Sequence, residues 1–351
     1  GSLARLALPM LAFSSSPSFV APRIRHSSPG AAAMASHPEH MQCMEVWGGN
    51  QIVDDSVVVA GLDAWVYSKP YGASEGGGDV YYLSSCATGR IARLLLADVS
   101  GHGEAVRAIA VDLRELMRRF VNQIDHSQFI RLMNQQFAIM AKAGNFATAV
   151  VSTFFAPTAR LTICNAGHPI PIYYRAATKQ WSFLEAKETQ ARPEEPVNLP
   201  LGILDLADYQ TFDVQLKTGD LVLCYTDSLV ESRGPDGELL GHEGLMEIVR
   251  SVPIAEPREF VRALLAAVEA KNPGNLSKDD VSVLLFRPNG QGRRPSLVTQ
   301  AVAVGKMTAA IARSLRPGGP PVPWPDFQLP NVPGMVIPPL QRLWSTRKAD
   351  T

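Results

Sequence analysis

The sequence predicts a protein of the α+β class, in which strands and helices occur in separate runs along the chain. Segments with the apolar or alternating pattern of strands form three groups, at residues 52–97, 147–184 and 209–225. Segments with apolar residues at helical spacing form two pairs, at residues 104–123 with 127–142 and at 243–252 with 257–271. A last apolar strand, at residues 281–286, follows the second pair of helices.

The first group divides into strands that turn signals separate. A Val-rich strand covers residues 52–60 and an alternating one covers 62–67. Three glycines then precede a strand at 80–83, and a hairpin returns through 91–97. In the first helix pair Ser127 is a suitable N-cap for the second helix. The second group contains strands at 147–155, 161–165, 170–174 and about 181–184, and the third contains strands at 209–216 and 221–225.

The length of the chain allows one large domain with tails or two domains. The chain has 351 residues, of which 46% are hydrophobic and 19% are charged, an ordinary composition for a globular protein. We expect residues 43–288 to form the domain. Residues 1–42 carry no acidic residue before Glu39, and we expect a disordered or non-native segment there. Residues 289–351 are predicted to form a linker, a short helix at 298–315 and a Pro-rich tail.

Charge and cysteine usage exclude several classes of partner and location. The 33 basic and 33 acidic residues cancel, so we predict neither nucleic acid nor an anionic membrane as a partner. No apolar run is long enough to cross a bilayer. The cysteines, at positions 43, 86, 164 and 224, form no CxxC pair. They are typical of reduced cysteines in a cytoplasmic protein.

Aspartates stand where predicted strands begin or end. Asp98 follows the apolar run Leu94–Ala97 and precedes a Gly-rich turn, and Asp79 enters its strand from Gly76–Gly78. The two strands form a hairpin, so we expect Asp79 and Asp98 on neighbouring strands, facing the same space. For Asp98 alone, capping of the following turn is an equal alternative. Asp227 also follows a buried strand, and Asp279 and Asp280 precede the last one.

Acidic side chains gathered at core strand ends imply a cation among them, because burying isolated carboxylates is costly. Oxygen ligands suit Mg²⁺ or Mn²⁺ and not zinc. Two such ions, roughly 3.5–4 Å apart, can activate a shared water for attack on a phosphoryl group. Independent turn aspartates are the alternative. His168 lies in a turn between two strands, where a histidine is more often structural than catalytic.

Ordered motifs make the chain resemble the SpoIIE/RsbU-like branch of the PPM-type metal-dependent serine/threonine protein phosphatases. The motifs lie between about residue 75 and residue 287 and are Gly77-Gly78-Asp79-Val80-Tyr81, Ala97-Asp98-Val99-Ser100-Gly101-His102-Gly103, Asn165-Ala166-Gly167-His168-Pro169, Pro200-Leu201-Gly202, Gly219-Asp220 through Tyr225-Thr226-Asp227, and Asp279-Asp280-Val281-Ser282. The resemblance implies an α-β-β-α sandwich of two antiparallel sheets flanked by helices. It also implies phosphoserine/phosphothreonine protein phosphatase activity with two Mn²⁺ or Mg²⁺ ions and a metal-bridged hydroxide as nucleophile.

The resemblance assigns roles to individual residues. The implied metal ligands are Asp79, Asp98, the backbone carbonyl of Val99, Asp227, and Asp279 with Asp280 in reserve. Asp98 is also implied in catalysis, and His102 is a candidate acid for the leaving oxygen. Arg90 and Arg107 are candidates for binding the phosphate. The implied substrate is a phosphorylated protein, for example one like an anti-sigma-factor antagonist, in bacterial-type regulatory signalling. A homodimer is left open.

Two departures from the family pattern keep a second hypothesis open. Tyr82 stands where the family often has a further acid, and Ser228 stands where a glycine commonly follows the Thr-Asp pair. The alternatives to the phosphatase are a pseudophosphatase that binds phosphoproteins without hydrolysis and a hydrolase for another phosphate ester.

Overall fold

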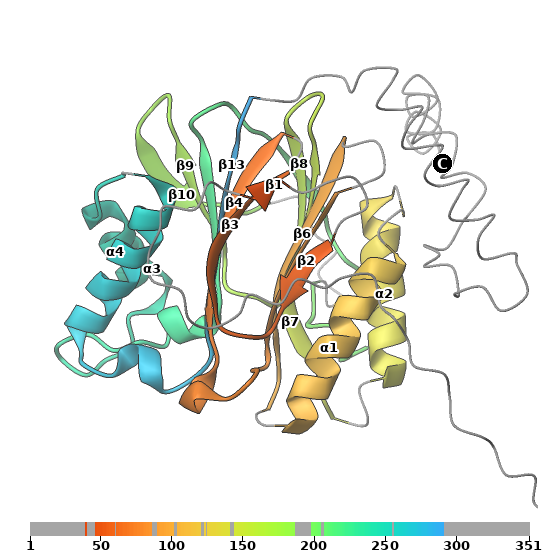
Figure 1. Ribbon diagram of the computed structural model, residues 1–351, viewed down its shortest axis with the longest axis horizontal. Helices are drawn as coiled ribbons and strands as arrows, with labels where there is room; N and C mark the ends of the chain where they lie inside the picture. Colours follow the sequence, from red (N-terminus) through yellow and green to blue (C-terminus); the bar gives the residue numbers. More distant parts are fainter. Residues whose placement is uncertain are drawn as a thin grey trace, which may run out of the picture. The chain divides into compact units, whose positions relative to one another are not determined.

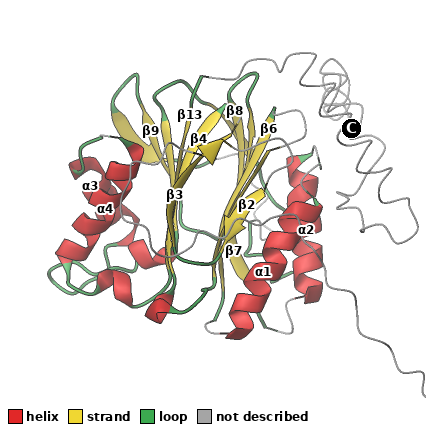
Figure 2. Ribbon diagram, in the orientation of Figure 1, coloured by secondary structure: helices red, strands yellow, loops and turns green. Residues whose placement is uncertain are grey.

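Two β-sheets lie face to face between two pairs of helices in the computed structural model of the protein (Figures 1 and 2). The structure describes residues 39–40, 46–59, 61–85, 90–101, 104–120, 123, 125–140, 144–186, 198–204, 207–254 and 256–290. Helices α1 (Glu104–Arg119) and α2 (His126–Met140) cover one sheet, and α3 (Gly241–Ser251) and α4 (Pro257–Lys271) cover the other. The expected α-β-β-α sandwich is confirmed.

The sheet under α3 and α4 has seven strands in the order β1-β3-β4-β13-β12-β9-β10. Their bounds are Glu39–His40 (β1), Val53–Val59 (β3), Leu62–Lys69 (β4), Val281–Pro288 (β13), Leu221–Tyr225 (β12), Ile172–Arg175 (β9) and Gln180–Phe183 (β10). All pairs are antiparallel except β1 with β3. β13, the last of the described strands in sequence, therefore lies in the middle of this sheet.

The sheet under α1 and α2 has six antiparallel strands in the order β11-β8-β7-β6-β5-β2. Their bounds are Phe212–Gln215 (β11), Arg160–Ala166 (β8), Ala147–Phe155 (β7), Ile91–Val99 (β6), Asp79–Ser85 (β5) and Val46–Gly49 (β2). The strands predicted from sequence are thus present, with ends that differ by a few residues. Short 3₁₀ segments complete the fold at Tyr71–Ala73 (η1), Asp227–Leu229 (η2) and Asn275–Ser277 (η3).

Three apolar layers hold the sandwich together. Leu94, Leu96 and Phe154 belong to the layer between the sheets. Leu95 and Phe129 pack between the six-stranded sheet and its helices, and a third layer lies beneath α3 and α4. Full burial of one such side chain contributes roughly 1.5–3 kcal/mol. Alternation along β6 therefore sends neighbouring leucines into different layers, as expected for a strand covered on both faces.

The start of α2 differs from the expectation. Asp125 Oδ1 accepts a hydrogen bond from the backbone N–H of Gln128 at 3.0 Å, so Asp125 is the N-cap and the prediction of Ser127 was wrong. Ser127 lies in the first turn of the helix, with its hydroxyl 3.5 Å from that of Thr211. Serine and aspartate are both favoured N-caps, but the carboxylate of Asp125, two residues before Ser127, is the group that accepts the free N–H of Gln128.

Further predictions concern the two ends of the chain, the cysteines and membrane-spanning segments. Residues 39–40, inside the segment expected to be disordered, pair as β1 with β3. Residues 1–38 and 291–351, with the helix predicted at 298–315, lie outside the described residues. Cys164 and Cys224 are buried free thiols, as predicted. None of the described helices has the length and apolar character needed to cross a membrane.

Candidate metal centre

Asp79 and Asp98 lie directly opposite each other in the β5–β6 ladder. Tyr81, Leu83, Leu94 and Leu96 of these strands point into the layer between the sheets, and the alternation places both aspartates on that same face. Side chains opposite each other on one face have Cβ atoms about 4.5–5.5 Å apart. The expected juxtaposition of Asp79 and Asp98 is therefore confirmed.

Asp280, directly before β13 of the other sheet, binds the loop that leads into β5. Its carboxylate accepts the backbone N–H groups of Tyr71 at 2.6 Å and Gly78 at 2.5 Å, with that of Asp79 at 3.4 Å. A Cβ atom at Gly77 would overlap this carboxylate, and one at Gly78 would lie 2.9 Å from the carbonyl oxygen of Val99. The two glycines are thus needed for close approach, and Asp280 fixes the position of Asp79.

Thr226 makes a second connection across the sheets. Its hydroxyl donates to Asp79 Oδ2 at 3.0 Å and accepts the backbone N–H of Ser282 at 3.0 Å. The Thr226 N–H donates in turn to the Ser282 carbonyl at 3.0 Å. Asp227 follows as the first residue of η2. Thr226 and Asp227 directly follow β12, and Asp280 directly precedes β13. All three therefore lie at the edge where β5 begins.

The electrostatics show that the acidic side chains share one environment. Burial and then repulsion by Asp227, Asp279, Asp280 and Glu231 raise the pKa of Asp98 to about 7. Burial, then Glu231 and Asp279, raise the pKa of Asp227 to about 6. The pKa of Asp79 is also well above its ordinary value, first because of burial and then because of Asp98 and Asp280. A positive charge among these oxygens would relieve this repulsion.

The structure brings the predicted ligands together to different degrees. Asp79 is buried, Asp98 and Asp227 are half-buried, and Asp279 is exposed beside them. In the described part of the chain no three His, Cys, Asp or Glu side chains are positioned to hold an ion. The donors are nevertheless all oxygens, which fits a hard divalent cation. His102 lies outside the described residues.

Sequence reasoning missed Glu231. It lies four residues after Asp227, and its backbone N–H donates to the Asp227 carbonyl at 2.8 Å. Of the neighbouring charges, that of Glu231 contributes most to the raised pKa of Asp227. The proximity of Glu231 to Asp227 was predictable from their spacing, because residues i and i+4 lie on the same face of a helical turn.

The departures from the family pattern have structural explanations. Tyr82 is fully buried in the layer beneath α1 and α2, on the face of β5 opposite to Asp79. Ser228 is not among the described residues with positive φ, so its position in η2 does not require a glycine.

The two arginines named from sequence lie in different places. Arg90 precedes β6, whereas Asp98 lies near the other end of that strand. At about 3.3 Å per residue this places them roughly 26 Å apart, so the Arg90 hypothesis was wrong. Arg107, on α1, forms an ion pair at 3.1 Å with Glu75, close to the glycine loop. Arg107 thus stays a candidate for contacting a substrate phosphate.

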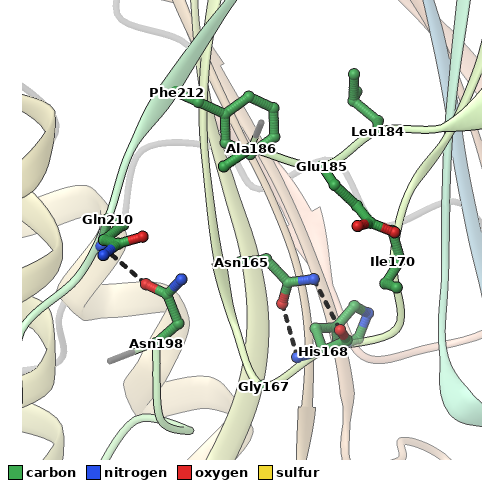
Figure 3. A pocket seen from close by; sticks show the side chains of 10 residues that line it. All are labelled: Asn165, Gly167, His168, Ile170, Leu184, Glu185, Ala186, Asn198, Gln210 and Phe212. Atoms are coloured by element: carbon green, nitrogen blue, oxygen red, sulfur yellow. Dashed lines mark hydrogen bonds between the residues drawn. The ribbon is translucent and has the colours of Figure 1, made fainter. Parts of the chain in front are cut away.

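The turn after β8 borders a pocket of about 370 Å³ (Figure 3). Asn165, His168, Leu184 and Phe212 are among its lining residues, and none of the five aspartates lines it. The Asn165 side chain accepts the N–H of His168 at 2.8 Å and donates to its carbonyl at 2.8 Å (Figure 3). The buried imidazole of His168 faces Thr148, with Nδ1 2.8 Å from the threonine hydroxyl.

Solved structures identify the class of fold. The chain resembles the PP2C phosphatase domain, solved with a fragment of the regulatory domain, of the Bacillus subtilis cell fate determinant SpoIIE (19% identity, TM-score 0.52, covering 70% of this chain and 64% of that one). It also resembles the RsbU and RsbW domains of a Mycobacterium tuberculosis protein (21% identity, TM-score 0.54, covering 76% and 75%). The fold is that of PP2C phosphatase domains.

The family follows from the sequence comparison. The model of the family "Stage II sporulation protein E (SpoIIE)" matches residues 88–289, and the chain belongs to this family. A curated relative, the phosphoserine phosphatase RsbU of Bacillus subtilis (strain 168), is 24% identical over 227 residues, which are 64% of this chain. The match covers 63% of that relative's length.

Proposed function

We propose that the protein is a metal-dependent phosphoserine/phosphothreonine protein phosphatase whose domain spans residues 43–288. The observation that carries the proposal is that Asp98, directly opposite Asp79 in the β5–β6 ladder, has its pKa raised by the charges of Asp227 and Asp279, which lie next to β12 and β13 of the other sheet. A relative named as a phosphoserine phosphatase supports the reaction class.

In this proposal Asp79, Asp98, Asp227, Asp279 and the Val99 carbonyl hold two Mn²⁺ or Mg²⁺ ions. Asp280 is assigned to the scaffold instead, because its carboxylate already accepts the N–H groups of Tyr71 and Gly78. When bound, such ions lower the pKa of a water and neutralise charge on a phosphoryl group. We assign Arg107 to orient the phosphate and His102 to protonate the departing oxygen.

The substrate we propose is a phosphorylated signalling protein of the anti-sigma-antagonist kind, which is the class that the resemblance of the motifs implies. A cytoplasmic location is supported by the free buried thiols of Cys164 and Cys224.

The test is hydrolysis of a chromogenic phosphate ester and of phosphoserine peptides by the full chain, with Mn²⁺ or Mg²⁺ and with chelator. Asp98→Asn and Asp279→Asn should each lower the rate by more than about tenfold, because each removes ligand charge. Asp112→Asn, at an exposed aspartate of α1, is the matched control and should retain full activity. Metal-independent turnover, or full activity of both ligand variants, would contradict the proposal.

A pseudophosphatase is the second candidate, and the replacement of a family acid by Tyr82 favours it. The same assay separates the two. Tight binding of a phosphoprotein without release of phosphate at any Mn²⁺ or Mg²⁺ concentration would establish the binding module.

A further inference from the structure

We propose that His168 is a positioning residue that fixes the separation between Asp98 on β6 and Asp227, which begins η2 just after β12 of the other sheet. Its meaning for catalysis rests on the proposed function, whereas the separation itself is a property of the metal-free fold. His168 lies outside the acidic cluster, in the turn between β8 of the six-stranded sheet and β9 of the seven-stranded sheet.

On one side the imidazole is bound to the neighbour of Asp98. Nδ1 of His168 lies 2.8 Å from the hydroxyl of Thr148, and Thr148 is the β7 residue directly opposite Asp98 in the β6–β7 ladder. Residues opposite each other in a ladder present their side chains on the same face, about 4.5–5.5 Å apart at Cβ. A displacement of His168 therefore reaches Asp98 through one hydrogen bond and one cross-strand contact.

On the other side the turn that carries His168 is bound to the residue that leads to Asp227. The Tyr225 hydroxyl donates at 2.8 Å to the carbonyl of Ile170, two residues after His168, and the backbone carbonyl of Tyr225 opposes the lowering of the His168 pKa by burial. Nδ1 is bound to Thr148, whereas the buried Nε2 has no hydrogen-bond partner among the described residues. The Nδ1–Thr148 contact is a hydrogen bond in either tautomer, because the threonine hydroxyl can both donate and accept. Tyr225 ends β12, two residues before Asp227.

The turn that carries His168 is held in place from several directions. Asn165 binds both backbone polar groups of His168 (Figure 3). Gly167 has a φ of 68°, and a Cβ atom there would lie 2.6 Å from Pro200. The Tyr225 hydroxyl donates to the Ile170 carbonyl at 2.8 Å. The imidazole is therefore a rigid spacer between the two sheets and not a mobile side chain.

The chain supplies a matched control. His126 is equally buried, and its Nδ1 lies 2.8 Å from the hydroxyl of Thr153, which is also on β7. Thr153 is opposite Arg93, five residues along β6 from Asp98. Replacement of His126 thus perturbs the same kind of buried imidazole–threonine bond at the far end of the strand.

The decisive experiment measures the energetic coupling between Asp98→Asn and Asp227→Asn by denaturant unfolding of the metal-free full chain at pH 8. Two like charges at a fixed short separation give a non-zero coupling. We expect His168→Ala and Thr148→Val each to reduce this coupling by at least half, and His126→Gln to leave it unchanged. Thr148→Val removes only the hydroxyl, so it decides the question even where His168→Ala does not fold.

A second measurement uses Mn²⁺ alone as the probe. The Mn²⁺ concentration that gives half of the maximal thermal stabilisation should rise roughly tenfold in Thr148→Val and remain unchanged in His126→Gln. The proposal would be overturned if the coupling between Asp98→Asn and Asp227→Asn stayed unchanged while the His168 and His126 variants lost equal stability. His168 would then have a structural role only. Absence of hydrolysis by the wild type would refute the phosphatase, while the coupling would still decide the role of His168.

Discussion

Thr226 follows β12 of the seven-stranded sheet and Asp79 begins β5 of the six-stranded sheet, 147 positions apart in sequence, yet the Thr226 hydroxyl donates to the Asp79 carboxyl at 3.0 Å. Both side chains are buried. The same hydroxyl oxygen accepts the N–H of Ser282, so one atom connects β5, β12 and β13. The edge at which the aspartates lie is consequently held by hydrogen bonds between the two sheets. Its geometry depends on Thr226 and Ser282 as well as on the aspartates.

Replacing Thr226 by Val should destabilise the protein by about 1–3 kcal/mol, because the Ser282 N–H and the Asp79 carboxyl both lose a buried partner. Chemical denaturation of the metal-free protein measures this. Thr226→Ser keeps the hydroxyl and should recover most of the loss. Equal destabilisation by Val and Ser would show that the methyl group matters and the hydrogen bond does not.

Asp98→Asn should stabilise the metal-free protein, and more so at pH 8 than at pH 5. The pKa of Asp98 is raised to about 7 in the folded state, against about 3.9 in the unfolded chain. The stability linked to its protonation is therefore fully present below about pH 4 and is lost as the pH rises through 7. Asparagine carries no such charge, so the variant should gain on the order of 1–3 kcal/mol at pH 8.

The measurement is the free energy of unfolding of both proteins at the two pH values with chelator present. Asp112→Asn, at an exposed aspartate, should show no comparable difference. An advantage of Asp98→Asn that shrinks towards pH 8 would contradict the raised pKa.

Gly77→Ala should disrupt the loop that leads into Asp79, because its new methyl group would overlap the Asp280 carboxylate. We expect a loss of about 1–3 kcal/mol in stability and weaker stabilisation by Mn²⁺. Gly49→Ala is the control, since a Cβ there would meet its nearest atom, the Tyr81 hydroxyl oxygen, at 3.4 Å. Thermal unfolding with and without Mn²⁺ gives both quantities, and equal behaviour of the two variants would remove the role of Gly77.

His126 should make the protein sensitive to acid. Burial and then Arg93 lower its pKa to about 3 in the folded state, whereas an unfolded histidine titrates near 6.5. The unfolded chain alone takes up this proton as the pH falls from about 6.5 towards 3, so stability falls over that window. The wild type should lose more stability between pH 7 and pH 5 than His126→Gln, and parallel losses would count against this assignment.

Much of the arrangement was predictable because its signals are local. Apolar runs that stop at a carboxylate marked Asp98 and Asp227, and the hairpin between residues 79 and 98 predicted that the two aspartates face each other. Register in a short hairpin follows from the alternation and the turn.

The role of Asp280 was not predictable, because its partners Tyr71 and Gly78 lie 209 and 202 residues away in sequence. Adjacent carboxylates look equivalent in a sequence, and only the packed sheets show which of the two meets backbone N–H groups. The position of Arg90 was misjudged for a related reason. Arg90 and Asp98 are only eight residues apart in sequence, but eight residues of an extended strand span nearly the whole length of β6.

The place of β13 between β4 and β12 has a consequence for synthesis of the protein. A nascent chain that has left the ribosome only as far as α4 lacks the middle strand of one sheet, the scaffold carboxylate of Asp280 and the exposed carboxylate of Asp279. The seven-stranded sheet cannot close until residues 281–288 emerge. Translation fragments that stop before them should therefore be unable to assemble the centre, so that a complete domain is a precondition for activity.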